Sequence, residues 1–474
     1  MIIVSWQFFI FVLAVLAVYY LLPPRAQLVW LLLASCVFYA WLGWGLILAL
    51  GFLVGFNFLI GLQLSRPAPC RRLWLWLGIA LNIVMLAAFK YFDFFEPQVA
   101  AALAGLNIRV DEAALAVLTP VGLSFTVLQT ISYLVDVSRG QLSAMPALLD
   151  FALYVAYFPK LTSGPIERAR TFLPRLANPR VVDNDMLTRS FGLVMLGLFR
   201  KVVIADQLKT QIPANLFTQP LLAVRHGPDA ILYLVAYGFY LFNDFAGYTA
   251  IVRGVSGFFG IELSPNFLTP FFSRDFTEFW NQWHISLSEW LRDYIYFPVT
   301  RFFLRRNANP RFVLTLVVPP MVTMLVSGLW HNASLPLLVW GALHGVYLTV
   351  ERVWSAFRPV RRPGQRPLAL QILSGALVFV LVTIAWIPFN VTGLVRGRAY
   401  IQAMLQPGAL KDSLPVIVFI ALGLLLDGLQ RVSAQELFFL KWPKPAQAAL
   451  LTAAGLVLIM MAAQTTPYFV YQNF

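Results

Sequence analysis

Charged residues are scarce in this sequence, and their scarcity excludes an ordinary water-soluble fold. Of 474 residues, only 12% are Asp, Glu, Lys or Arg, whereas 59% are hydrophobic, and the mean hydropathy is +0.74. Soluble domains average about a quarter charged residues. A chain of this composition has more apolar side chains than one core can hold, so many of them must face lipid.

Cysteine is also rare, and the sequence patterns of zinc sites and serine hydrolases are missing. Cys36 lies in an apolar run and Cys70 in a basic segment, so the two predict neither a disulfide nor a zinc site. No Cys or Glu completes a metal-ligand spacing with the four histidines. No G-x-S-x-G nucleophile turn is present. These absences argue against a zinc enzyme and a serine hydrolase, and we expect no metal and no bound cofactor.

Apolar runs long enough to cross a bilayer, about 18 to 25 residues each, recur along the whole chain. We predict spans within residues 5–22, 28–64 (enough for two), 73–90, 187–204, 228–243, 312–330, 335–350, 370–388, 414–427 and 447–464. The first run lacks the basic start and cleavage site of a signal peptide, so we expect it to be retained. With no internal repeat, the sequence predicts one all-α, polytopic membrane domain over residues 1–474.

Positive charge is concentrated in short segments between these runs. The chain has 35 Lys plus Arg against 21 Asp plus Glu, a net charge of +14. In a soluble protein this balance would suggest nucleic acid, but cytoplasmic loops of membrane proteins collect such residues. We therefore expect no nucleic-acid partner and place the loops near Arg71, Arg170, Arg305 and Arg361 in the cytoplasm. Counting spans outward from them puts both termini on the extracytoplasmic side.

His331 ends one apolar run, and the next begins at Leu335. An ionisable side chain at membrane depth indicates function by default. Desolvation favours the neutral ring, which suits a general base that accepts a hydroxyl proton. The alternative is a histidine that only hydrogen-bonds between helices.

The other histidines differ in their surroundings. His284 lies in the aromatic, amphipathic segment 276–298, which is too charged to span simply and predicts an interfacial or re-entrant helix. His344 stands deep in a span with glycines beside it that would let helices approach closely, so we predict a structural role. His226 lies in a polar loop and is interpreted as a surface residue.

Several spaced motifs resemble the signature of the membrane-bound O-acyltransferase family, in particular its bacterial polysaccharide branch of alginate O-acetylation and teichoic acid D-alanylation. The motifs are Trp283-His284-Ile285-Ser286-Leu287-Ser288, Trp290-Leu291-Arg292-Asp293-Tyr294, Gly328-Leu329-Trp330-His331, Trp340-Gly341, His344-Gly345, Gly122-Leu123-Ser124-Phe125, Phe158-Pro159-Lys160-Leu161 and Asp244-Phe245-Ala246-Gly247-Tyr248. The chain departs from the family pattern at Asn332, where Gly is usual, and at Thr249-Ala250, where a Ser-Asp pair is usual.

This resemblance implies a fold of about 10–13 membrane helices plus re-entrant segments around a central tunnel. It also implies that His331 is catalytic and that His284 occupies a second polar catalytic position. In the simplest scheme His331 removes the proton of an acceptor hydroxyl, while His284 orients the donor or stabilises developing charge. We expect the neighbouring motif residues to contact substrates, namely Trp283, Arg292, Asp293, Trp330 and Asn332.

The resulting hypothesis is an O-acyltransferase of the bacterial inner membrane. It would move an acyl group, in the simplest case acetyl from acetyl-CoA, towards hydroxyls of an exported polysaccharide with the help of an extracytoplasmic, esterase-like partner. The aromatic tail at residues 468–474 would contact that partner, carry the acyl group on a tyrosine, or serve only as an anchor at the membrane interface. Two alternatives stay open: a transporter or channel, against which the lack of repeated halves argues, and a lysophospholipid acyltransferase of the same fold.

Overall fold

The computed structural model describes residues 3–66, 69–90, 122–177, 182–307, 309, 311–357, 367–411 and 413–462, and all regular elements in these ranges are helical. Seven helices are long and apolar enough to cross a membrane, and three shorter apolar helices accompany them. The predicted all-α, polytopic fold is thereby confirmed. The aromatic tail at 468–474, the basic residues 361–366 and the segment 91–121 lie outside the described residues.

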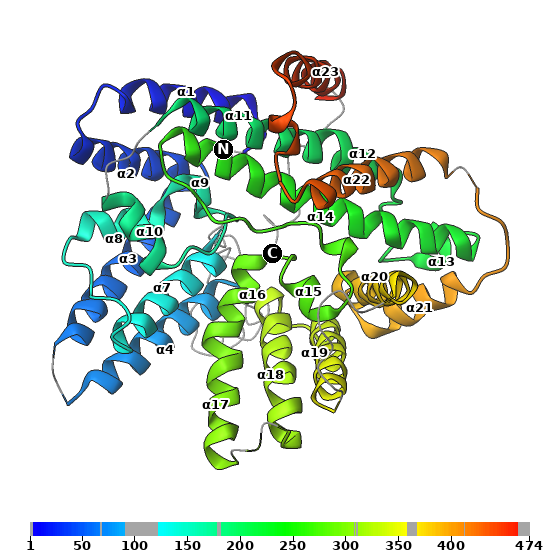
Figure 1. Ribbon diagram of the computed structural model, residues 1–474. Helices are drawn as coiled ribbons and strands as arrows, with labels where there is room; N and C mark the ends of the chain where they lie inside the picture. The colour runs from blue at the N-terminus through cyan, green and yellow to red at the C-terminus, as the bar shows by residue number, and fades with distance from the viewer. Residues whose placement is uncertain are drawn as a thin grey trace, which may run out of the picture. The chain divides into compact units, whose positions relative to one another are not determined.

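The chain forms two compact units, one made of Met1–Ser190 with Val252–Ser264 and the other of Phe191–Ile251 with the described residues from Pro265 onward. The prediction of a single domain stays a prediction. Helices wholly in the first unit are α1 (Trp6–Tyr19), α2 (Pro24–Ala40), α3 (Trp44–Ser65), α4 (Arg71–Lys90), α7 (Leu123–Ser138), α8 (Leu148–Ala156), α9 (Phe158–Leu161) and α10 (Ala169–Ala177) (Figure 1).

Two further helices, α11 (Asn184–Leu198) and α14 (Gly227–Phe258), have residues in both units. The remaining elements belong to the second unit: η1 (Phe199–Ala205), α12 (Asp206–Gln211), α13 (Pro220–Ala223), η2 (Pro270–Phe272), α15 (Phe276–Trp280), α16 (Ile285–Leu291), η3 (Arg292–Tyr296), α17 (Phe297–Arg306), α18 (Val313–His331), α19 (Leu335–Ala356), α20 (Leu368–Asn390), α21 (Leu394–Met404), α22 (Leu414–Ser433), η4 (Phe438–Lys441) and α23 (Lys444–Ala462).

Local sequence signals explain where the first helices begin. The hydroxyl of Ser5 caps α1 by accepting a hydrogen bond from the backbone N–H of Phe8 at 3.3 Å. Pro24 occupies the first position of α2, where a missing backbone N–H does no harm. The long run 28–64 is divided into α2 and α3 just before Trp44, as expected of a stretch long enough for two spans.

Polar side chains join helices inside the first unit. Asn57 of α3 and Asn82 of α4 exchange side-chain hydrogen bonds of 3.2 and 2.8 Å, and the hydroxyl of Thr130 in α7 donates to Asn82 at 2.8 Å. All three side chains are buried. Such bonds between helices are a common source of affinity where lipid removes the hydrophobic driving force.

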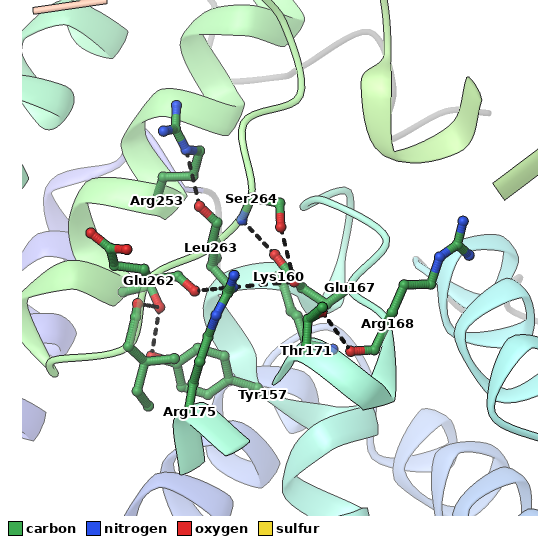
Figure 2. A network of polar contacts seen from close by, with 12 residues as sticks. Tyr157, Lys160, Glu167, Arg168, Thr171, Arg175, Arg253, Glu262, Leu263 and Ser264 are labelled. Atoms are coloured by element: carbon green, nitrogen blue, oxygen red, sulfur yellow. Dashed lines mark hydrogen bonds and ion pairs between the residues drawn. The ribbon is translucent and has the colours of Figure 1, made fainter. Parts of the chain in front are cut away.

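A buried carboxylate fixes the loop that follows α9 (Figure 2). Glu167 accepts hydrogen bonds from the backbone N–H of Ser264 at 2.5 Å and from its hydroxyl at 3.2 Å. Arg175 of α10 lies 3.4 Å from the same carboxylate and donates to the backbone oxygen of Glu262 at 2.6 Å. These bonds hold 167–175 against 262–264 within the first unit.

Two buried basic side chains in the second unit, Arg200 and Lys201, are paired with buried carboxylates. Lys201 in the π-helix η1 contacts Asp206 at 2.8 Å and Asp244 of α14 at 2.6 Å. Its neighbour Arg200 binds Asp427 of α22 at 2.6 Å. Burying either partner alone would be costly, so these pairs explain how charged residues are tolerated within apolar helices.

The hairpin of α18 and α19 positions His331 (Figure 1). A Cβ atom added to Gly328 would lie 2.3 Å from the backbone oxygen of Leu337, and one added to Gly341 would lie 2.4 Å from that of Met324. The two helices therefore touch through their backbones. This close approach confirms the role predicted for the glycines beside His344.

Candidate active site

His284 stands in the turn between α15 and α16 in a conformation that is unusual for a residue with a side chain. Its φ of 43° and ψ of 53° lie in the left-handed region, and the side chain is only 1% exposed. For an L-residue this conformation costs roughly 1–2 kcal/mol. Backbone strain of this kind tends to persist at functional sites, where the surrounding structure enforces it.

A single asparagine, Asn266, holds this turn in place. The backbone oxygen of Asn266 accepts from the N–H of Ile285 at 2.8 Å. Its side-chain oxygen Oδ1 lies 3.1 Å from the N–H of Ser286, 2.8 Å from the Ser286 hydroxyl and 3.2 Å from Nδ1 of His284. Asn266 therefore holds the strained residue through its ring and through the two residues that follow it, Ile285 and Ser286.

His331 is the last residue of α18, and aromatic rings surround its imidazole. The ring centroids of Trp330, Trp340 and Phe389 lie 4.9, 5.3 and 5.2 Å from that of His331, which is 4% exposed. Trp330 also approaches His284, with 6.2 Å between centroids. The two histidines, 47 positions apart in sequence, thus contact the same tryptophan ring.

Burial governs the charge of His284. Desolvation lowers the pKa of His284 to about 3, and a weaker backbone hydrogen bond opposes the shift. The ring is consequently neutral at physiological pH. A neutral imidazole carries one donor nitrogen and one acceptor nitrogen, so it can accept a hydrogen bond or a proton from a substrate.

A cavity of about 590 Å³ in the second unit is lined mainly by residues of α15, α16, η3, α18 and α19, and neither candidate histidine is among its lining residues. Its charged lining comes from Glu289, Arg292, Glu351 and Arg352, and its wall includes Ile285, the residue after His284. Trp280 also lines it and packs on Trp340, the neighbour of His331, with centroids 5.9 Å apart. The cavity is therefore connected with His331 through the contact of Trp280 with Trp340, and with His284 through the adjacent residue Ile285.

The structure places the predicted substrate-contacting residues in four different surroundings. Trp330 lies between the two histidines, and Arg292 lines the cavity, paired with Asp293 at 3.1 Å. Trp283 is buried and stacked on Phe279, 5.7 Å between centroids. Asn332 is exposed where α18 ends. The catalytic and binding roles of these residues remain predictions.

The remaining histidines differ from the candidate pair. His344 is 1% exposed and packs between Trp280 and Trp340, with centroid distances of 5.1 and 4.9 Å. His226 is half-buried, and its Nδ1 lies 3.2 Å from the backbone oxygen of Pro407. Among the described residues, no group of three or more His, Cys, Asp or Glu is placed to hold a metal ion.

Three residues of the site were not found from the sequence. Asn266 precedes His284 by 18 positions and lies outside any helix, so no periodic pattern connects the two. Phe389 is an ordinary aromatic residue near the end of α20, and Arg352 reads as one of many basic residues at a span end. Only the folded chain brings them to the histidines and the cavity.

Comparison with known proteins gives these residues a family context. The sequence model of the membrane-bound O-acyltransferase family matches residues 9–390. A probable alginate O-acetylase of Pseudomonas syringae pv. tomato is 35% identical over 402 residues, covering 83% of this chain and 73% of that protein. A peptidoglycan O-acetyltransferase of Helicobacter pylori is 29% identical, covering 80% and 74% of the two chains. A teichoic acid D-alanyltransferase of Streptococcus thermophilus is 32% identical over 49% of this chain and 57% of its own length.

The match spans most of the described helices and includes both candidate histidines. The similarity to the alginate O-acetylase extends over more than two thirds of each chain. A transporter or channel is therefore no longer a competing interpretation. This multi-pass membrane protein belongs to the membrane-bound O-acyltransferase family and is an O-acyltransferase.

Proposed function

We propose that this protein moves an acetyl group from a cytoplasmic acyl thioester towards hydroxyl groups of an exported polysaccharide, together with an extracytoplasmic partner. The observation that carries the proposal is the contact of His284 and His331 with one buried tryptophan, Trp330. Two relatives bear names that specify O-acetylation, of alginate and of peptidoglycan. Both names point to a glycan acceptor, which favours this proposal over a lysophospholipid acceptor.

The proposed reaction is the conversion of a thioester and a hydroxyl into an ester and a thiol. As the acceptor oxygen attacks the carbonyl carbon, His331 takes the hydroxyl proton. A C–O bond forms, the C–S bond breaks, and the proton passes from His331 to the leaving thiolate. This scheme requires no nucleophilic cysteine.

The cavity beside Arg292 and Arg352 supports entry of the donor at this point. A donor such as acetyl-CoA carries phosphates, and guanidinium groups are well suited to bind them. Thr277, Asn281 and Ser288 add polar groups that suit an amide-containing arm. Since Trp280 separates this cavity from Trp340, we infer that movement of these rings admits the thioester to His331.

The test compares variants of His331 in cells that make the acceptor glycan. His331→Ala removes the base, so glycan acetylation should fall on the order of a hundred to ten thousand fold. His331→Gln should fare no better, because an amide fills the space without accepting the proton. The amount of each variant in the membrane is measured beside glycan acetylation, and release of free thiol from acetyl-CoA is measured on the purified protein with its partner.

His344→Ala is the matched control, since His344 is equally buried and packs on the same Trp340 ring. If His344 is structural, its loss should lower the amount of folded protein and the acetylation in parallel. Normal acetylation by well-folded His331→Ala protein would overturn the catalytic assignment. Wild-type protein that interacts with no acyl-CoA, even with its partner present, would overturn the proposed donor.

A further inference from the structure

The hydrogen bonds around Asn266 determine which nitrogen of His284 carries the proton. The backbone N–H of Ser286 can only donate, and it lies 3.1 Å from one side-chain atom of Asn266. That atom must be the amide oxygen, because the amide nitrogen is itself a donor. The backbone N–H of Ser286 thus determines which side-chain atom of Asn266 is the oxygen.

The same oxygen faces Nδ1 of His284 at 3.2 Å. An amide oxygen only accepts, so a hydrogen bond at this distance requires a proton on Nδ1. In the neutral ring the lone pair then resides on Nε2. His284 is therefore an acceptor at Nε2, and an Nε2 without a proton cannot donate a hydrogen bond to a developing oxyanion.

We propose that Asn266 is a positioning residue that fixes His284 in the Nδ1–H form, so that Nε2 accepts a hydrogen bond from an N–H group in the amide-containing arm of the acyl donor and leaves the acceptor hydroxyl to His331. This inference rests on the proposed function and deepens it. Of the two roles expected for His284, orientation of the donor and stabilisation of developing charge, it selects orientation of the donor. Donors for the oxyanion must come from elsewhere in the site.

The chemistry of an amide explains why an asparagine suits this position. An aspartate would accept the same hydrogen bonds, but its negative charge would favour the protonated imidazolium ring. An amide oxygen orients the ring while leaving it neutral. The Asn266 amide nitrogen is buried and makes no hydrogen bond with the described residues. All hydrogen bonds of this side chain to the His284 turn are accepted by its oxygen.

The aromatic surroundings of His284 have the same effect on its charge. Phe245 lies edge-on at 4.9 Å between centroids, and Phe267 lies at 6.1 Å. Neither ring offers a charge that would stabilise an imidazolium. The uncharged amide of Asn266 and the apolar rings around His284 thus both favour the neutral imidazole.

The direct test is nitrogen NMR on the full-length protein labelled with ¹⁵N-histidine. The chain contains only four histidines, so spectra of His284→Gln protein assign the His284 signals by their absence. We expect a protonated Nδ1 and an unprotonated Nε2 at neutral pH. A proton on Nε2, or on both nitrogens, would overturn the proposal whether or not acyl transfer is observed.

Two substitutions of Asn266 test the consequence for the reaction. Asn266→Ala should lower kcat on the order of a hundredfold through loss of orientation, with a smaller effect on the KM for the thioester. Asn266→Asp should shift the pH profile: because the carboxylate raises the pKa of His284, activity is lost at low pH and regained as pH rises. An unchanged pH profile and rate in Asn266→Asp would contradict the inference.

Asn82→Ala serves as the matched control for loss of a buried asparagine. Asn82 is fully buried and hydrogen-bonded to Asn57 and Thr130, in the other compact unit. We expect it to reduce the amount of folded protein while leaving the pH profile and the His284 signals unchanged. If the expected proton position is found and no acetyl transfer occurs in the wild type, the proposed function fails and the Asn266 inference stands.

Discussion

At the scale of single residues, Lys160 is a basic side chain of the first unit that is completely buried. It is 0% exposed, and its amine donates to the side-chain oxygen of Gln129 and, at 2.5 Å, to the backbone oxygen of Tyr154. Burial lowers the pKa of Lys160 to about 7, although the charge of Glu167 opposes the shift. The folded protein therefore disfavours the charged amine.

This environment predicts that stability depends on pH through Lys160. In the unfolded chain the lysine keeps its proton up to about pH 10.4, whereas the folded chain releases it near pH 7. Between these values the unfolded state binds more protons, so the free energy of unfolding rises with pH. From pH 7 to 8.5 the gain due to Lys160 should be about 1–2 kcal/mol.

Lys160→Met protein is the comparison, because it keeps the length of the side chain but has nothing to titrate. Unfolding of purified wild-type and variant protein is followed at pH 7 and pH 8.5. The wild type should gain more stability across this interval than the variant does. Equal gains would mean that Lys160 titrates normally in the folded chain.

At the scale of elements, the α18–α19 hairpin gives His331 its place. Gly341 is the point of closest approach, where an added methyl group would meet backbone atoms of Met324 and Leu325. Backbone cannot move aside as a flexible side chain can. Any residue with a Cβ atom at this position must therefore push the two helices apart.

We predict that Gly341→Ala destabilises the protein by roughly 1–3 kcal/mol, the usual cost of overpacking. Because the adjacent Trp340 packs on His331, acyl transfer should fall more than the amount of folded protein does. Thermal unfolding and activity per folded molecule are the measurements.

Gly455→Ala in α23 is the matched control, since nothing lies within 4 Å of an added Cβ there. Alanine is favoured over glycine inside a helix, so this variant should be as stable as the wild type or up to about 1 kcal/mol more stable. Similar behaviour of the two variants would show that the close approach at Gly341 has no energetic consequence.

The sequence predicted the long helices well, because their apolar runs are uninterrupted. It underestimated α14, which was expected to end at residue 243 and continues to Phe258. The cause is Asp244, a charge that ends an apolar pattern but is neutralised in the fold by Lys201. No apolar run predicts a span at α7, because its Ser, Thr and Gln residues interrupt the pattern although nearly all of them are buried.

The site was predictable only where residue type reveals chemistry. His284 and His331 stand out because histidines are rare in apolar sequence, and the family motifs surround them. Asn266 has no such distinction, since its importance lies in a backbone N–H and an imidazole 18 to 20 positions away. The cavity likewise depends on side chains of several helices whose packing no single segment determines.

At the scale of the whole molecule, the orientation in the membrane follows from the distribution of basic residues, and it remains a prediction. The proposed reaction requires it, because an acyl-CoA donor is cytoplasmic whereas the glycan is assembled for export. Cys70 is an exposed native residue next to Arg71 and Arg72, in a loop that we place in the cytoplasm. The thiol of Cys70 can therefore report on which side of the membrane this loop lies.

We predict that Cys70 in intact cells does not react with a membrane-impermeant thiol reagent and reacts once the cells are permeabilised. In protein that lacks Cys36 and Cys70, a cysteine introduced at Gln472 should react without permeabilisation, because counting spans places the C-terminus outside. A cysteine introduced at Arg305, at the basic end of α17, should behave like Cys70. Labelling of Cys70 and of the Gln472 variant to the same extent in intact cells would contradict the predicted orientation. The donor and the acceptor would then need to meet His331 from other sides, while the family assignment would remain.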